Sequence, residues 1–124
     1  MINPSTLTEE MMDEIAQKFD SVQVCDDTCI NLFIKNKWAL HKTVEWAKED
    51  DLYIKRAAFI MMGALARDDK EMQEFVFGVF IPIMIRESKD ERVEIQEAIT
   101  WALDKISKRS DGLHKRVQES GLKA

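Results

Sequence analysis

The sequence predicts an all-α fold, built as a stack of antiparallel helical hairpins. Apolar residues recur every three to four positions through most of the chain, and no segment shows the strict alternation of a strand. Turn-forming residues are scarce, with four glycines and two prolines in 124 residues. The polar breaks between periodic segments are only a few residues long, which makes successive helices antiparallel neighbours.

Three helices are predicted in the N-terminal half. The first begins in the segment STLTEE, where Thr6 and Glu9 fit a capping box, and it runs to about Phe19. The polar pair DS then breaks the pattern. The second helix covers about 22–35, and the third covers 38–48 after the polar turn KNK.

Four helices are predicted in the C-terminal half, and short polar breaks separate them. The fourth covers about 52–67, the fifth 71–87, the sixth 91–108 and the seventh 113–120. Pro82 lies inside the fifth helix and is expected to kink it.

The composition is that of a folded protein, with 45% apolar and 33% charged residues. We therefore expect residues 1–124 to form a single domain without long disordered segments. Cys25 and Cys29 lie one helical turn apart, a strained spacing for a disulfide, and both histidines are distant in sequence. The two cysteines are interpreted as small buried apolar residues, and no metal site or cofactor is predicted.

The sequence is also expected to belong to a cytoplasmic protein. The opening residues lack the pattern of a secretory signal peptide. The longest apolar run, FVFGVFIPIMI, has 11 residues. A membrane-spanning helix needs at least ~18 apolar residues, so no membrane association is predicted.

The net charge of −5 is unevenly distributed along the chain. Residues 105–124 carry six basic and two acidic side chains, whereas the rest is strongly acidic. An acidic body disfavours broad contact with phosphates. The basic end leaves two interpretations open, a local contact with an anion or a solvated helix end.

Two charged residues fall among apolar positions of their helices. Asp26 lies within the apolar arc of the second helix, near Val22 and Ile30. Three interpretations are open for it: a position at the N-terminal end of a helix that starts later, a structural ion pair, or catalysis. Arg56 points away from the main apolar stripe of the fourth helix, and we expect Asp26 to be its partner. Phosphate binding is the alternative for Arg56.

Trp101 lies off the apolar stripe of the sixth helix, in line with charged residues such as Glu97 and Lys105. A large indole at this position must be covered by another helix, a second chain or a ligand. It is therefore interpreted either as a plug between helices or chains, or as a platform for a ligand.

Three segments carry a resemblance to a known family. The segments FDSVQVCDDTC, DLYIKRAAF and EIQEAITWALDKISKR are similar, in order and spacing, to the DNA alkylation repair (AlkD-type) DNA glycosylases. That family forms a curved stack of HEAT-like helical repeats. It excises N3- and N7-alkylated purines by hydrolysing the N-glycosidic bond.

The resemblance implies a role for four residues. The family's catalytic aspartate corresponds to Asp26, and its substrate-binding residues correspond to Arg56, Trp101 and Tyr53, the last standing where tryptophan is usual. The implied partner is alkylated duplex DNA.

Three positions depart from the family pattern. Val22 replaces a tryptophan, Glu97 a lysine and Asp104 an arginine. Each change removes an aromatic or positive group from the surface that would hold DNA. The sequence therefore predicts a compact member of this superfamily that is associated with DNA and has weak or no N-glycosylase activity.

The alternative is a non-enzymatic HEAT-like module that binds protein, above all a second copy of itself. The fifth helix is apolar around its whole circumference from Phe75 to Ile85. Neighbouring helices are expected to cover only part of it, leaving rings such as Phe77 and Phe80 to be buried by a partner. The sequence therefore predicts a homodimer through this helix.

Overall fold

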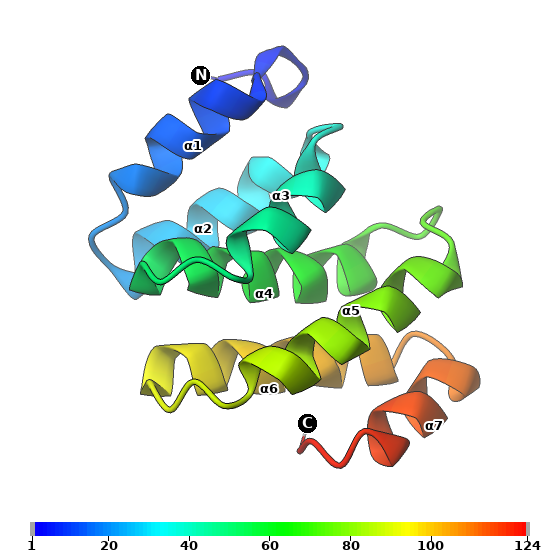
Figure 1. Cartoon of the computed structure of the whole chain (residues 1–124). Coiled ribbons are helices and arrows are strands. Elements are labelled where there is room, and N and C mark those ends of the chain that lie inside the picture. Colours follow the sequence, from blue (N-terminus) through cyan, green and yellow to red (C-terminus); the bar gives the residue numbers. More distant parts are fainter. Residues whose placement is uncertain (1, 124) are drawn as a thin grey trace.

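The computed structural model describes residues 2–123, and helices joined by short loops make up this range (Figure 1). No strand occurs within it, so the predicted all-α class is confirmed. The α-helices are α1 (Glu9–Gln17), α2 (Val22–Asn31), α3 (Ala39–Trp46), α4 (Leu52–Asp68), α5 (Glu74–Glu87), α6 (Val93–Ser107) and α7 (Asp111–Glu119). Two short 3-10 helices accompany them, at Pro4–Thr6 and Phe33–Lys35.

Helix α4 is the centre of the molecule. Every residue from 55 to 66 is buried, because α2 and α3 pack on one side of α4 and α6 packs on the other (Figure 1). Gly63 allows the close approach of α6, since a Cβ atom there would lie only 2.9 Å from the Cα atom of Ala102. Short connections join successive helices, and the arrangement fits the predicted stack of helical hairpins.

Side-chain oxygens cap the N-termini of several helices. Thr8 Oγ1 accepts a hydrogen bond from the backbone N–H of Met11, so α1 starts after Thr8. The predicted capping box of Thr6 and Glu9 is wrong, because Thr6 lies in the preceding 3-10 helix. Ser21 caps α2 in the same way as Thr8 caps α1, by accepting from Val24 N.

Helix α5 is covered more completely than the sequence suggested. Phe77 and Phe80 are both fully buried within the chain, because α7 packs on α5 in addition to α4 and α6. The expectation that these two rings need a partner chain is therefore wrong. Three large hydrophobic side chains of α5 do stay exposed: Phe75 (66% exposed), Val79 (53%) and Ile85 (42%).

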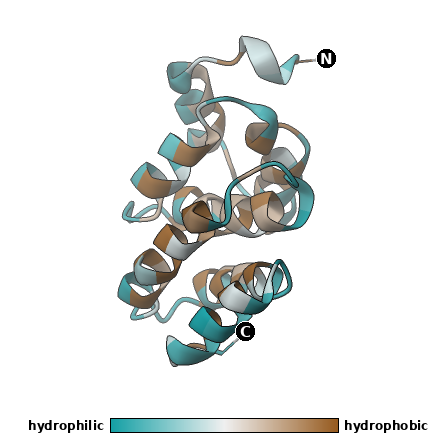
Figure 2. Cartoon of the chain, turned by 90° about the vertical axis from the view of Figure 1, so that its right-hand side faces the viewer, coloured by the Kyte–Doolittle hydropathy of each residue, from teal (hydrophilic) through white to brown (hydrophobic). Residues whose placement is uncertain are grey.

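The polarity of the chain follows this packing. Apolar residues concentrate where helices face one another, while the loops are mostly polar (Figure 2). Cys25 and Cys29 are buried and unpaired with each other, as predicted, and they face α4. None of the helices between residues 2 and 123 combines the length and the apolar character needed to cross a membrane.

Candidate functional site

Asp26 and Arg56 form a bidentate ion pair between α2 and α4. Arg56 Nε donates to Asp26 Oδ1 at 2.9 Å, and Arg56 Nη2 donates to Asp26 Oδ2 at 2.8 Å. This geometry confirms the pair predicted from the sequence. Because α2 begins at Val22, Asp26 lies inside the helix, and its interpretation as a residue at the helix N-terminal end is wrong.

Arg56 is almost completely enclosed. Its side chain is 8% exposed, compared with 24% for Asp26. Its remaining amino group, Nη1, donates to the carbonyl oxygen of Glu94 at 2.7 Å and lies 3.5 Å from Glu97 Oε1, both on α6. The hydrogen bonds to Asp26 raise the pKa of Arg56, although burial alone would lower it. Arg56 therefore links α2, α4 and α6 as a permanent cation.

Trp101 lies directly on the backbone of α4. A Cβ atom at Gly63 would be 2.5 Å from the ring atom Cζ3 of Trp101, so only glycine leaves room for the indole. Two cations flank the ring: Arg67 Cζ and Lys105 Nζ each lie 5.6 Å from its centre. Trp101 is half-buried. A neighbouring helix thus covers part of the indole, and the rest faces a pocket.

This pocket is open to solvent and has a volume of about 500 Å³. It unites three of the four site residues predicted from the sequence, Asp26, Arg56 and Trp101, but Tyr53 is not among its lining residues. Tyr53 is half-buried, and its carbonyl oxygen accepts a hydrogen bond from the thiol of Cys25. The lining residues are Val22, Asp26, Ile30, Arg56, Ile60, Arg67, Glu97 and Trp101.

Arg67 is the charged lining residue that sequence reasoning missed. It continues the stripe of Arg56, Ile60 and Gly63 by one further turn, at the end of α4. This periodicity is the signal that could have identified it. Its guanidinium also pairs with Asp68, at 2.7 Å between Nε and Oδ1.

A second, basic pocket adjoins the first through Arg67. Its volume is about 370 Å³, and its lining residues are Ala66, Arg67, Lys70, Lys105, Lys108 and Arg109. Arg109 is fixed there because its guanidinium donates to the carbonyl oxygens of Ala66 (2.9 Å) and Met72 (2.6 Å) at the end of α4. The folded chain thus gathers basic residues from two segments about 40 positions apart. We call the two adjoining pockets the α4–α6 groove.

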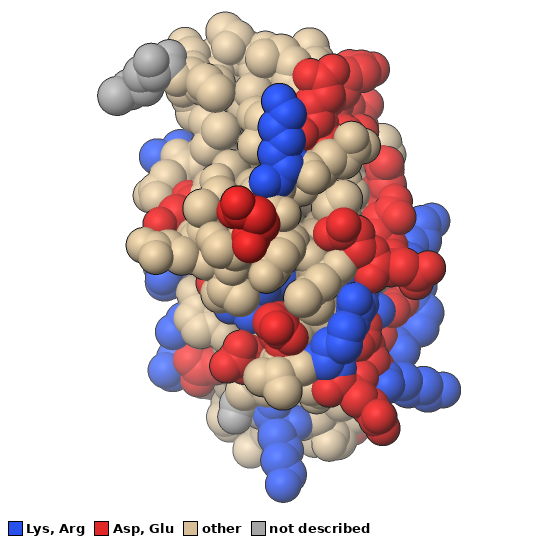
Figure 3. All heavy atoms as spheres, turned by 90° about the vertical axis from the view of Figure 1, so that its left-hand side faces the viewer, with Lys and Arg blue, Asp and Glu red and all other residues tan. Residues whose placement is uncertain are grey.

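The charge along the α4–α6 groove is uneven. At one end the carboxylates of Asp26 and Glu97 are mixed with Arg56 and Arg67, whereas all the charged lining residues of the other end are basic. Asp104 moderates the basic end: it pairs with Lys108 at 3.0 Å and with Lys105 at 3.3 Å, and these contacts lower its pKa. Acidic and basic side chains are also mixed on the face shown in Figure 3.

This arrangement has the parts needed to bind an anionic chain and a flat or cationic group side by side. The basic end offers charge-assisted donors for phosphates. The indole offers an aromatic face, and Asp26 offers a fixed negative charge. The model of the DNA alkylation repair enzyme family matches residues 3–117.

The chain belongs to the DNA alkylation repair enzyme family.

This membership confirms the resemblance drawn from the three sequence segments. No curated protein and no solved structure matches the chain. The roles that the family resemblance implies for Asp26, Arg56, Trp101 and Tyr53 stay predictions. Asp26, Arg56 and Trp101 line one pocket of this DNA alkylation repair family member, and Tyr53 lies outside it.

Proposed function

We propose that this member of the DNA alkylation repair family binds DNA along the α4–α6 groove and has weak or no N-glycosylase activity. The observation that carries the proposal is the continuity of the groove: Arg67 lines both the pocket of Asp26 and Trp101 and the basic pocket beside it. A phosphodiester strand lying along the basic end would place a nucleotide next to the indole. Phosphate contacts then supply the affinity.

The proposed weakness of catalysis has a structural reason. Glycosidic cleavage builds positive charge on the sugar, and a carboxylate with free charge stabilises it best. Both oxygens of Asp26 accept hydrogen bonds from Arg56, so much of that charge is already neutralised. The pocket also has Val22 and Glu97 at positions where the family resemblance calls for an aromatic and a positive group.

DNA binding is tested by fluorescence anisotropy with a short labelled duplex at ~50 and ~200 mM salt. We expect binding at the lower salt concentration that weakens steeply at the higher one, because counterions are released from the DNA. The double variant Lys105→Gln/Lys108→Gln should make the slope of log affinity against log salt concentration shallower, by the equivalent of about two phosphate contacts. The matched control Lys18→Gln/Lys89→Gln removes two exposed cations outside the groove and should change it little. Absence of binding at ~50 mM salt would contradict the proposal.

Catalysis is tested by chromatography of 7-methylguanine released from methylated duplex DNA. We expect slow or undetectable release by the wild-type chain. Rapid release that disappears in Asp26→Asn would show that the pairing with Arg56 does not disable the carboxylate. The DNA-binding proposal would survive that result, since the two experiments have separate readouts.

A non-enzymatic module that self-associates is the second candidate function. The exposed side chains of Phe75, Val79 and Ile85 on α5 favour it. This interface lies on a different helix from the lining of the α4–α6 groove, so dimerisation and DNA binding are compatible.

A further inference from the structure

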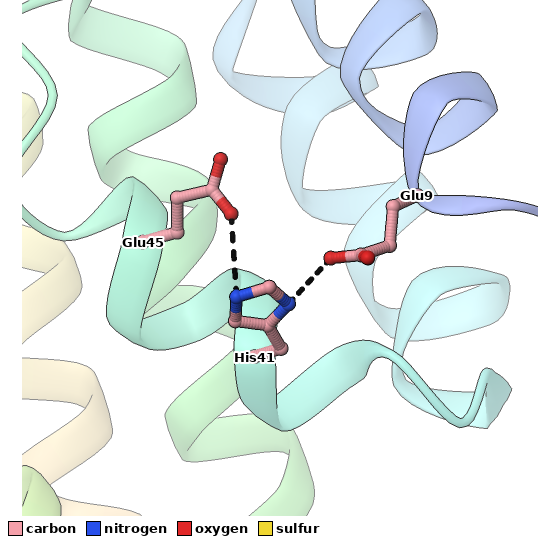
Figure 4. Close-up of side chains that lie close together, drawn as sticks. All are labelled: Glu9, His41 and Glu45. Atoms are coloured by element: carbon pink, nitrogen blue, oxygen red, sulfur yellow. Dashed lines mark ion pairs between the residues drawn. The ribbon is translucent and has the colours of Figure 1, made fainter.

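A separate cluster of metal-ligand side chains lies between α1 and α3. Glu9 is the first residue of α1, and His41 and Glu45 are one turn apart on α3. One ligand atom from each lies within 4.8 Å of the other two. Figure 4 shows the imidazole ring of His41 between the two carboxylates. None of the three residues lines the α4–α6 groove.

Both nitrogens of the His41 ring face a carboxylate oxygen. Nδ1 contacts Glu9 Oε1, and Nε2 lies 3.7 Å from Glu45 Oε2. An imidazole nitrogen that carries no hydrogen offers a lone pair, and this lone pair can bind a metal ion. The carboxylate oxygens of Glu9 and Glu45 lie close enough to the ring to supply the other two ligands.

The surrounding charges also leave room for a cation. Lys42 Nζ is enclosed, with its side chain 3% exposed, and it lies 3.0 Å from Asp13, 3.3 Å from Glu45 and 3.7 Å from Glu9. Three carboxylates thus surround one ammonium group, which leaves an excess of two negative charges among these four side chains. One divalent cation would balance them.

We propose that Glu9, His41 and Glu45 form a site for a divalent transition-metal ion, with Zn²⁺ as the best match. An imidazole nitrogen with carboxylate oxygens is a ligand set that Zn²⁺ accepts, whereas Mg²⁺ and Ca²⁺ prefer oxygen ligands alone. Three protein ligands leave a fourth tetrahedral position for water. Glu9 and Glu45 face different nitrogens of the His41 ring, so the side chains have to rotate until one nitrogen and both carboxylates face the ion at Zn²⁺ bond lengths of ~2.0–2.2 Å.

The cluster can make this adjustment because it lies at the surface. The side chains of Glu9, His41 and Glu45 are 27%, 59% and 39% exposed, so their rotamers are free to change and an ion can enter from solution. The bound ion would join the first helix to the third. The ion would therefore stabilise the N-terminal end of the stack.

The test is a calorimetric titration of the full chain with ZnCl₂ at pH 7.5, together with thermal unfolding in the presence and absence of ~100 μM Zn²⁺. We expect one equivalent to bind and the melting temperature to rise by several degrees. His41→Gln should weaken binding at least tenfold and abolish the rise. His114→Gln is the matched control, because it removes the second of the two histidines, which lies on α7, and it should bind like wild type.

Glu45→Gln provides a second variant with the same expected loss. Melting curves without zinc should show that both variants are folded, because the side chains of His41 and Glu45 are 59% and 39% exposed. The proposal is overturned if wild type binds no zinc up to ~1 mM. It is equally overturned if His41→Gln and Glu45→Gln both bind as tightly as wild type, since the ion then lies elsewhere.

Discussion

At the scale of single residues, the Asp26–Arg56 pair is the clearest energetic feature. We expect Arg56→Ala to lower the free energy of unfolding by about 3 kcal/mol, because it leaves the Asp26 carboxylate without its partner in a partly enclosed site. Urea unfolding measures the effect. Asp27→Asn is the control, because the side chain of Asp27 is exposed and its loss should change the free energy of unfolding little. A loss below about 1 kcal/mol for Arg56→Ala would mean that the pair is solvated like a surface ion pair.

Gly63 gives a second prediction at this scale. We expect Gly63→Ala to destabilise the chain by about 2 kcal/mol, because the added methyl group would overlap the Trp101 ring and approach the backbone at Ala102. The displaced indole should also change the tryptophan emission spectrum.

The matched control for Gly63→Ala is Gly112→Ala. The nearest atom to a Cβ atom at Gly112 is Glu74 Oε2 at 3.7 Å, an ordinary contact. Alanine there should stabilise α7 by about 0.5–1 kcal/mol through helix propensity. Equal effects of the two variants would show that Trp101 moves aside without cost.

At the scale of elements, a cluster of ion pairs connects α4 to the turn between α5 and α6. Lys55 Nζ on α4 lies 2.9 Å from Glu87 and 3.0 Å from Asp90. Burial alone would lower the pKa of Lys55, but hydrogen bonds to both carboxylates raise it above its ordinary value. Arg92 also pairs with Asp90 at 2.7 Å, and its hydrogen bonds hold the pKa of Asp90 far below the ordinary range. The turn is therefore fixed by charge rather than by apolar contacts.

This cluster predicts a pH-dependent stability. The pKa of Asp90 is lowered in the folded chain, so the ionised carboxylate contributes to the free energy of unfolding. This contribution is complete above the ordinary aspartate pKa of about 4 and disappears as the pH falls below that value. We expect Asp90→Asn to be about 2 kcal/mol less stable than wild type at pH 7, and this difference should shrink between pH ~4 and ~2. Urea unfolding across this range tests it, with Asp27→Asn as the control. A difference that stays constant down to pH ~2.5 would contradict the assigned pKa shift.

At the scale of the whole molecule, self-association through α5 stays a prediction. It rests on the exposed side chains of Phe75, Val79 and Ile85, because Phe77 and Phe80 are buried within the chain. Light scattering at micromolar concentration should report twice the 14.4 kDa of the chain, about 29 kDa. Phe75→Asp/Val79→Glu should return the monomer mass, and Val93→Asp, an exposed apolar position on α6, serves as the control. A wild-type mass of 14.4 kDa would leave α5 as a solvated surface.

The sequence by itself determined the helices and one tertiary contact. Helical periodicity and short polar breaks located all seven α-helices of residues 2–123, because local patterning follows the position of each residue on its helix. The Asp26–Arg56 pair could also be predicted, since each charge falls among apolar residues and needs a partner.

Only the tertiary structure decided which distant side chains meet. Arg67 lies beside Lys105 because α4 and α6 approach closely at Gly63, and His41 meets Glu9 because the start of α1 lies near α3 in the folded chain. The burial of Phe77 depends on α7 in the same way. The periodicity of one helix gives the direction of its side chains but not the angle or depth at which a second helix packs against it.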